Sequence, residues 1–197
     1  MIILKDLSRS RRQIIIEEAA VLFNDKGYSS TSMKDIANSI GVKAASLYNH
    51  IESKQEILSV LLLFIANKFQ EGIEDIDKSS YSFNEKLKEI IKMHIRVSIE
   101  NRHITALITQ DWKHLEEPSL TEFKTIRTNY QTVLKKILSN GMESGEFKIT
   151  HLDITLNVIL SSLRWIYNTE IYDNISNVGL AELERTILEI VFSGIEE

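Results

Sequence analysis

The stretch SSTSMKDIANSIGVKAASLYNHIESK, residues 29–54, decides the fold that this chain is expected to adopt. It contains two short helical patterns, residues 33–40 and 43–50, which meet at Gly41. Apolar residues recur at helical spacing within it, and glycine tolerates the left-handed backbone that a tight turn between helices often needs. The stretch therefore predicts a helix-turn-helix, a motif whose second helix lies in the DNA major groove.

Two local signals mark where helices begin around this motif. Ser32 is followed three residues later by Asp35, and Ser53 is followed three residues later by Glu56. Each pair has the spacing of a capping box, in which the two residues satisfy free backbone amides of the first helical turn. An amphipathic helix is expected upstream, ending near Gly27, so the N-terminal region should hold three helices.

Composition and charge are consistent with a globular helical regulator. The 197 residues are 43% hydrophobic and 26% charged, with one proline, seven glycines and no cysteine. Few helix breakers favour an all-α chain, and the absence of cysteine excludes disulfides and suits a reducing cytoplasm. The net charge is −5. The first 54 residues are mildly basic and the remainder is acidic, so attraction to phosphate would be confined to one end.

The rest of the chain reads as further helices, without strand-like alternation, internal repeats or an apolar run long enough to span a bilayer. We expect about nine helices in all. Beyond the motif, the expected helices cover residues 54–73, 82–101, 102–112, 118–144, 150–172 and 180–193.

Residues 9–64 resemble the DNA-binding domain of the TetR family of bacterial transcriptional repressors. The matching segments are AAVLFNDKGY (19–28), TSMKDIANSIGV (31–42) and SLYNHIESK (46–54), and the departure within them is Ile51 in a slot that is usually aromatic. The resemblance implies a DNA-binding domain of residues 1–53 and a helical ligand-binding and dimerisation domain of residues 54–197. It also implies a homodimer that binds a palindromic operator, double-stranded DNA whose symmetry matches that of the protein.

The resemblance also implies which side chains meet DNA. The start of the first motif helix would hold a phosphate, the first part of the second helix would face the groove, and three further side chains would contact the backbone. These positions are Thr31, Ser32 and Lys34; Lys43, Ala44, Ala45, Ser46 and Asn49; and Tyr48, His50 and Lys54. Ala44 and Ala45 can offer only methyl groups to thymine, so the operator sequence does not follow from them.

Apolar stripes on the last two long helices need a partner surface. In the family, the last two helices of each subunit form a four-helix dimer interface, although the same stripes could instead face the subunit's own core. The interface expected here comprises Leu156, Leu160, Leu163, Leu180, Leu183, Ile187, Ile190 and Val191.

The middle of the chain is expected to hold a small-molecule effector. Residues 123–195 resemble the effector domains of repressors that answer to acyl-CoA thioesters in fatty-acid, phenylacetate and sterol-side-chain degradation. The expected pocket residues are aromatic, thioether and cationic, namely Met93, Arg96, Trp112, Phe123, Arg127, Tyr130, Trp165 and Tyr172. The same aromatic residues could equally form ordinary core.

The sequence gives little support to an enzymatic function. No metal-binding histidine motif, phosphate-cradling glycine loop or nucleophile elbow occurs in the sequence, so no catalytic residue, metal or cofactor is predicted. The alternatives left open are a TetR-type regulator of efflux or stress genes that responds to hydrophobic drugs, and a helical protein-interaction module.

Overall fold

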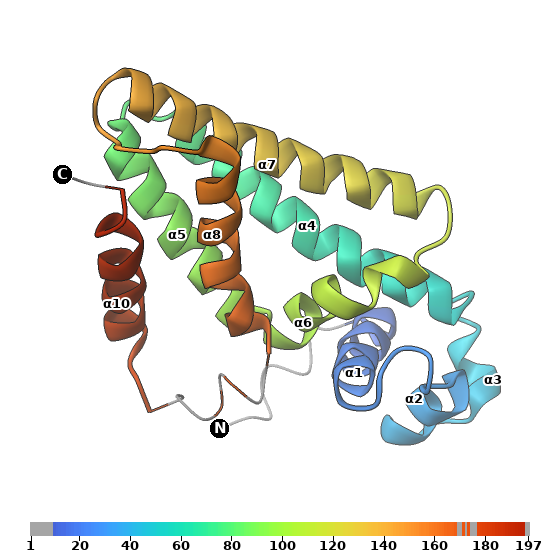
Figure 1. The fold of residues 1–197 in the computed structure, drawn as a ribbon. Helices are drawn as coiled ribbons and strands as arrows, with labels where there is room; N and C mark the ends of the chain where they lie inside the picture. Colours follow the sequence, from blue (N-terminus) through green and yellow to red (C-terminus); the bar gives the residue numbers. More distant parts are fainter. Residues whose placement is uncertain (1–9, 169–170, 172, 174–176, 196–197) are drawn as a thin grey trace. The chain divides into compact units, whose positions relative to one another are not determined.

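A computed structural model describes residues 10–168, 171, 173 and 177–195. These residues form nine α-helices and two short 3₁₀ helices, and no strand occurs among them (Figure 1). The all-α fold and the number of helices expected from the sequence are confirmed. None of the described helices is long and apolar enough to cross a bilayer.

The described chain falls into two compact units. The first contains residues 10–64 and 103–121, and the second contains residues 65–102 and the described residues from 122 onward. This division groups residues by their contacts and not by their roles, so the functional boundary expected at residue 54 stays a prediction.

The first unit is built around the helix-turn-helix. Its elements are α1 (Arg11–Lys26), α2 (Met33–Ser39), α3 (Ala44–Leu47), the start of α4 (Lys54–Lys78), most of α6 (Arg102–Gln110) and η2 (Trp112–His114). The capping box of Ser32 and Asp35 is present, and Gly41 has a φ of +70°, as the turn requires. Buried side chains come from one face of each helix and from the turn that follows α3: Ile15, Ala19, Phe23, Ile36, Ala37, Leu47, Ile51 and Leu58.

The second motif helix is shorter than the sequence predicted. It was expected to reach His50, but α3 ends at Leu47. The backbone amides of His50 and Ile51 both donate to the carbonyl of Leu47, at 2.8 and 3.0 Å. This convergence closes the chain into a turn, which buries Ile51 and leaves residues 48–50 exposed.

The second unit consists of long helices packed on one core. Besides the later part of α4, its elements are α5 (Phe83–Glu100), most of α7 (Ser119–Glu143), α8 (Leu152–Arg164), η3 (Trp165–Tyr167) and α10 (Leu180–Phe192). Helix α4 continues past its expected end to Lys78. Helix α8 ends earlier than expected because the backbone tightens into η3, where the amide of Asn168 donates to the carbonyl of Trp165 at 3.0 Å.

The end of α7 shows how a glycine lets the chain fold back on itself. Gly145, with a φ of +80°, reverses the backbone, and the amides of Glu146 and Phe147 both donate to the carbonyl of Gly141. The buried ring of Phe147 then lies on Gly141, where a Cβ atom would come within 2.2 Å of a ring carbon. Only glycine fits at position 141 without movement of the ring.

We predict that Gly141→Ala lowers the free energy of unfolding by about 1–3 kcal/mol, the usual cost of overpacking a core. Alanine inside a helix would ordinarily gain about 0.5–1 kcal/mol over glycine, so the steric contact must reverse the sign. Urea unfolding measures the change. Gly194→Ala is the matched control, because its Cβ would meet no atom closer than 3.6 Å, and a stabilised Gly141→Ala variant would contradict the prediction.

Candidate nucleic-acid interface and effector unit

The outer side of the helix-turn-helix is polar and open to solvent. Leu47 points into the core, whereas Tyr48 is 56% exposed. Most of the side chains expected to read or hold DNA share this exposed surface: Ser32, Lys34, Lys43, Ala45, Ser46, Tyr48, Asn49 and His50. Ala44 is half-buried. The structure therefore brings together most of the residues that the resemblance assigned to DNA.

Thr31 and Ser32, at the start of α2, lie in different environments. Thr31 is buried, and its hydroxyl lies 2.9 Å from the carbonyl of Gly27 and 3.3 Å from that of Leu22. Ser32 is exposed, and its hydroxyl donates to Asp35, whose pKa is lowered by the hydrogen bonds from Ser32. Of the two, Ser32 is the one whose side chain solvent, and hence a phosphate, can reach.

Lys54 holds the motif to the start of α4. Its ammonium donates to the carbonyls of Tyr28 and Thr31, both at 2.8 Å, and lies 4.2 Å from the centre of the Tyr28 ring. Partial burial lowers its pKa. This side chain stabilises the turn between α1 and α2, a role that the sequence did not indicate.

Tyr28 makes further contacts that join distant parts of the first unit. Its hydroxyl donates to Gln55 at 2.8 Å, and its ring stacks on His114 with centroids 5.4 Å apart. Its backbone amide donates to the carboxylate of Asp111, whose pKa is nevertheless raised by burial. The lysine–glycine–tyrosine ending of the first helix was a signal for Tyr28, but nothing in the sequence paired it with residues more than 80 positions away.

The residues expected to bind an effector do not form one cluster. Met93 is half-buried in the second unit, and Phe123 is buried there, whereas Trp112 belongs to the first unit. Arg96 makes a bidentate ion pair with Glu184, at 2.6 and 3.1 Å. The remaining members are Arg127, which is exposed, Tyr130, which is buried, Trp165, which is half-buried, and Tyr172, which lies outside the described residues.

Tyr130 belongs to a buried cluster with Phe69, His94 and Tyr167, which no pattern in the sequence predicts. Nδ1 of His94 lies 3.0 Å from the Tyr130 hydroxyl, and Nε2 lies 2.6 Å from the Tyr167 hydroxyl. Phe69 stacks on His94 with ring centroids 4.5 Å apart. Burial, with a smaller effect from Arg164, lowers the pKa of His94 to about 3, so the imidazole is uncharged at neutral pH. The aromatic cluster of Phe69, His94, Tyr130 and Tyr167 is thus a neutral polar site inside an apolar core.

The stripes expected to form a dimer interface mostly face the core of their own unit. Leu156, Leu160, Leu163, Leu183, Ile187 and Val191 are buried in the single chain, while Leu180 and Ile190 are exposed. Ile154 and Val158, one turn apart on α8, are 62% and 61% exposed and were not expected. Spacing alone identified an apolar side of each helix but not how much of that side the subunit itself covers.

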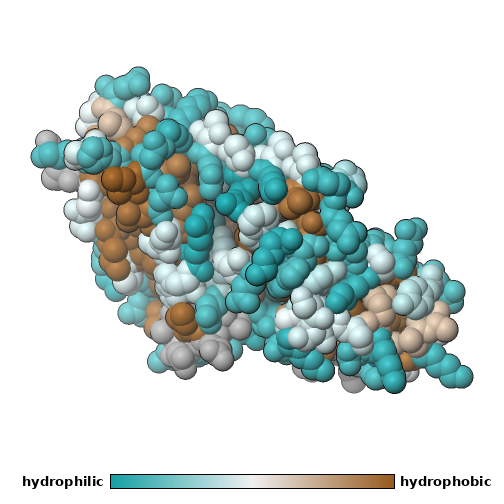
Figure 2. Space-filling model, turned by 45° about the vertical axis from the view of Figure 1, so that its right-hand side comes forward, coloured by the Kyte–Doolittle hydropathy of each residue, from teal (hydrophilic) through white to brown (hydrophobic). Residues whose placement is uncertain are grey.

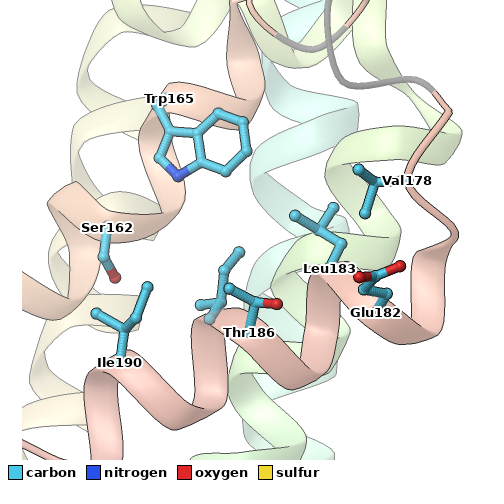
Figure 3. Close-up of a pocket in the computed structure, with 8 residues that line it drawn as sticks. Ser162, Trp165, Val178, Glu182, Leu183, Thr186 and Ile190 are labelled. Carbon is cyan, nitrogen blue, oxygen red and sulfur yellow. The ribbon is translucent and has the colours of Figure 1, made fainter.

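A pocket of about 360 Å³ lies between α8 with η3 and α10. Ser162 and Trp165 face Thr186 and Ile190 across it (Figure 3). The space-filling view shows apolar side chains gathered on one area of the surface, at its left (Figure 2). Ile154 and Val158 on α8 expose apolar side chains, and the pocket between α8 and α10 is lined mainly by apolar residues. Apolar surface of this kind often marks a binding site.

The helix-turn-helix of this chain packs its apolar side inward and exposes a polar side. This arrangement defines a class of DNA-binding regulators. Comparison with known families gives two matches: residues 15–61 match the model for bacterial regulatory proteins of the tetR family, and residues 80–168 match the tetracyclin repressor-like C-terminal domain. The chain belongs to the TetR family of transcriptional regulators. It is a ligand-responsive transcriptional repressor and not an enzyme.

Individual relatives match along nearly the whole chain. The chain is 28% identical to the fatty acid metabolism regulator protein of Bacillus subtilis, over 95% of this chain and 96% of that protein. It is 28% identical to the transcriptional repressor KstR2 of Mycolicibacterium smegmatis, over 95% and 92%. The crystal structure of AibR, in complex with isovaleryl coenzyme A and operator DNA, superposes with a TM-score of 0.80 at 21% identity, covering 93% of this chain and 98% of that one.

We predict that two lysines of the first unit have separable roles. Lys54→Met removes two charge-assisted hydrogen bonds and should lower the free energy of unfolding by about 1–3 kcal/mol. Lys43→Ala, at an exposed position, should change it by less than about 0.5 kcal/mol but weaken binding to the DNA upstream of the gene. It should also make the slope of log affinity against log salt concentration shallower by about one, because one fewer counterion is released on binding.

Urea unfolding and DNA titrations at several salt concentrations measure both variants side by side. Equal stability of Lys54→Met and the unchanged protein would refute its structural role. An unaltered salt dependence in Lys43→Ala would remove that residue from the DNA interface.

Proposed function

We propose that this chain is a homodimeric repressor that occupies a palindromic operator and is released from it by an acyl-CoA thioester. The observation that carries the proposal is the similarity to a fatty acid metabolism regulator, which extends over both units and not over the DNA-binding part alone. AibR, a protein of the same fold crystallised with isovaleryl coenzyme A, supports the ligand class. Repression of chromosomal genes would place the protein in the cytoplasm.

The proposed reading of DNA uses the exposed side of the motif twice in each dimer. Two recognition helices about 34–36 Å apart meet successive major grooves. Lys43, Ser46 and Asn49 offer hydrogen-bonding groups to base edges, and Tyr48 and His50 lie beside them at positions suited to backbone phosphates. Ala45 contributes a methyl group, so DNA shape must supply part of the specificity.

The proposed dimer uses the exposed side of α8 and α10. Ile154 and Val158 on α8 and Ile190 on α10 are each more than 60% exposed, Leu180 on α10 is 43% exposed, and Ile190 also lines the pocket at Trp165. A lone subunit would expose this apolar surface to water, whereas two copies would bury it. This proposed surface keeps Leu180 and Ile190 from the interface expected from the sequence, adds Ile154 and Val158, and leaves out the residues that the single chain buries.

The proposed coupling runs along α4, one continuous helix. It begins with Lys54, which holds the turn before α2, and it carries Phe69, which stacks on His94 in the second unit. An effector controls the operator only if it binds two states of the protein with different affinity. A ligand that displaces Phe69 would act on the helix whose first residue, Lys54, holds the turn before α2.

We predict that acyl-CoA thioesters weaken binding to the operator, taken as the DNA upstream of the gene, by about 5–150-fold, the usual range of coupling between two sites. A mobility-shift titration with acyl-CoAs of increasing chain length measures the effect, with free CoA as the control. If no chain length changes the affinity while hydrophobic cationic drugs release the DNA, the regulator of efflux or stress genes becomes the correct alternative.

We predict that Val158→Asp converts the dimer to a monomer, because one buried, unpaired carboxylate in each subunit opposes association. Analytical ultracentrifugation measures the oligomeric state, and operator binding should fall with it. Tyr81→Asp is the matched control, since Tyr81 is 52% exposed and lies outside α8 and α10. A Val158→Asp variant that remains dimeric would place the interface elsewhere.

A further inference from the structure

The buried aromatic cluster contains one more hydrogen-bond donor than it can use. An uncharged imidazole has one N–H donor and one bare nitrogen, and each tyrosine hydroxyl has one proton. His94, Tyr130 and Tyr167 therefore hold three protons, but only two contacts join them. Whatever the tautomer of His94, one proton is left over.

The two distances indicate where that proton lies. An O–H donor is usually 2.7–2.8 Å from its acceptor, and an N–H donor 2.9–3.0 Å from its oxygen. The 2.6 Å contact between Tyr167 and Nε2 fits a hydroxyl that donates to nitrogen, and the 3.0 Å contact between Nδ1 and Tyr130 fits a ring N–H that donates to oxygen. The hydroxyl proton of Tyr130 is then the unused donor.

Among the described residues, the contact with His94 is the one hydrogen bond found for the hydroxyl of Tyr130. Within the cluster the neighbouring group is the ring of Phe69, at 6.2 Å between centroids, in an edge arrangement. A buried donor without an acceptor is unfavourable, so a group that supplies an oxygen here is favoured.

We infer that the hydroxyl of Tyr130 is the donor that recognises the thioester carbonyl of the effector, with His94 and Tyr167 fixing its direction. The inference rests on the proposed function and assigns the polar contact within it. Tyr167 donates to His94, His94 donates to the oxygen of Tyr130, and Tyr130 is left to donate to the ligand.

The chemistry of the cluster suits a neutral carbonyl. The imidazole is uncharged and both phenols stay protonated, because burial raises the pKa of Tyr130 and Tyr167. None of the four side chains of the cluster is charged; the nearby cation, Arg164, is exposed and acts on His94 and Tyr167, so nothing inside the cluster offsets the cost of burying a phosphate or carboxylate. The ring of Phe69, which stacks on His94 and meets the ring of Tyr130 edge-on, is the apolar side chain beside this donor.

The test compares two ligands that differ at one atom. An acyl-CoA keeps the carbonyl, and the S-alkyl-CoA thioether of the same chain length lacks it. The unchanged protein should bind the acyl-CoA about three- to tenfold more tightly than the thioether, as expected for one hydrogen bond. Tyr130→Phe should remove this preference, and Tyr81→Phe, at an exposed position, should retain it.

Isothermal titration of both ligands measures the affinities, and a melting curve of each variant establishes that it is folded. If both ligands bind the unchanged protein equally, the inference is overturned and a buried water is the acceptor for Tyr130. If acyl-CoA binds and releases the operator but Tyr130→Phe keeps the preference, the proposed function stands and the role of Tyr130 is refuted. If neither ligand binds, both fail.

An infrared measurement tests the inference without a variant. An acyl-CoA labelled with ¹³C at the carbonyl should show a lower stretching frequency when bound to the unchanged protein than in an alkane solvent. A frequency equal to that in alkane would mean that no donor reaches the carbonyl.

Discussion

The ammonium of Lys54 sits where the chain passes from the DNA-binding motif into the long helix α4, and the arrangement of the first unit depends on it. It donates to two carbonyls of the turn between α1 and α2, and it lies over the ring of Tyr28. Tyr28 in turn contacts Gln55, Asp111 and His114. The helices of the motif are short, so these contacts add to its apolar core and keep its outer side in one orientation.

The second unit meets a different constraint, because it must remain a stable core and also admit a ligand. Most of its interior is leucine and isoleucine, which pack without directional preference. The aromatic cluster is the exception. Its hydrogen bonds order three helical elements, α5, α7 and η3, yet leave one donor free, so the same residues can stabilise the empty protein and recognise a carbonyl.

The apolar side chains of α8 and α10 show what helical spacing can and cannot predict. The stripes on α8 and α10 were correctly placed on helices, but each stripe is wide enough to face both the core and a partner. The subunit covers Leu163 and Ile187, and it leaves Val158 and Ile190 to solvent. Which part of an apolar stripe remains exposed depends on the rotation of each helix about its axis, which packing against α5 and its neighbours decides.

The sequence by itself determined where most helices begin and that Gly41 has a left-handed backbone. It also determined that the chain belongs among helix-turn-helix regulators. Capping boxes, glycine turns and family motifs act within a few residues, so they can be read directly. The early end of α3 and the packing of Phe147 on Gly141 were decided only by the tertiary structure. So was the meeting of His94 with Tyr130 and Tyr167, which are 36 and 73 residues away along the chain. Such contacts join segments that are brought together only when the helices pack, and no local pattern records which residues will then be neighbours.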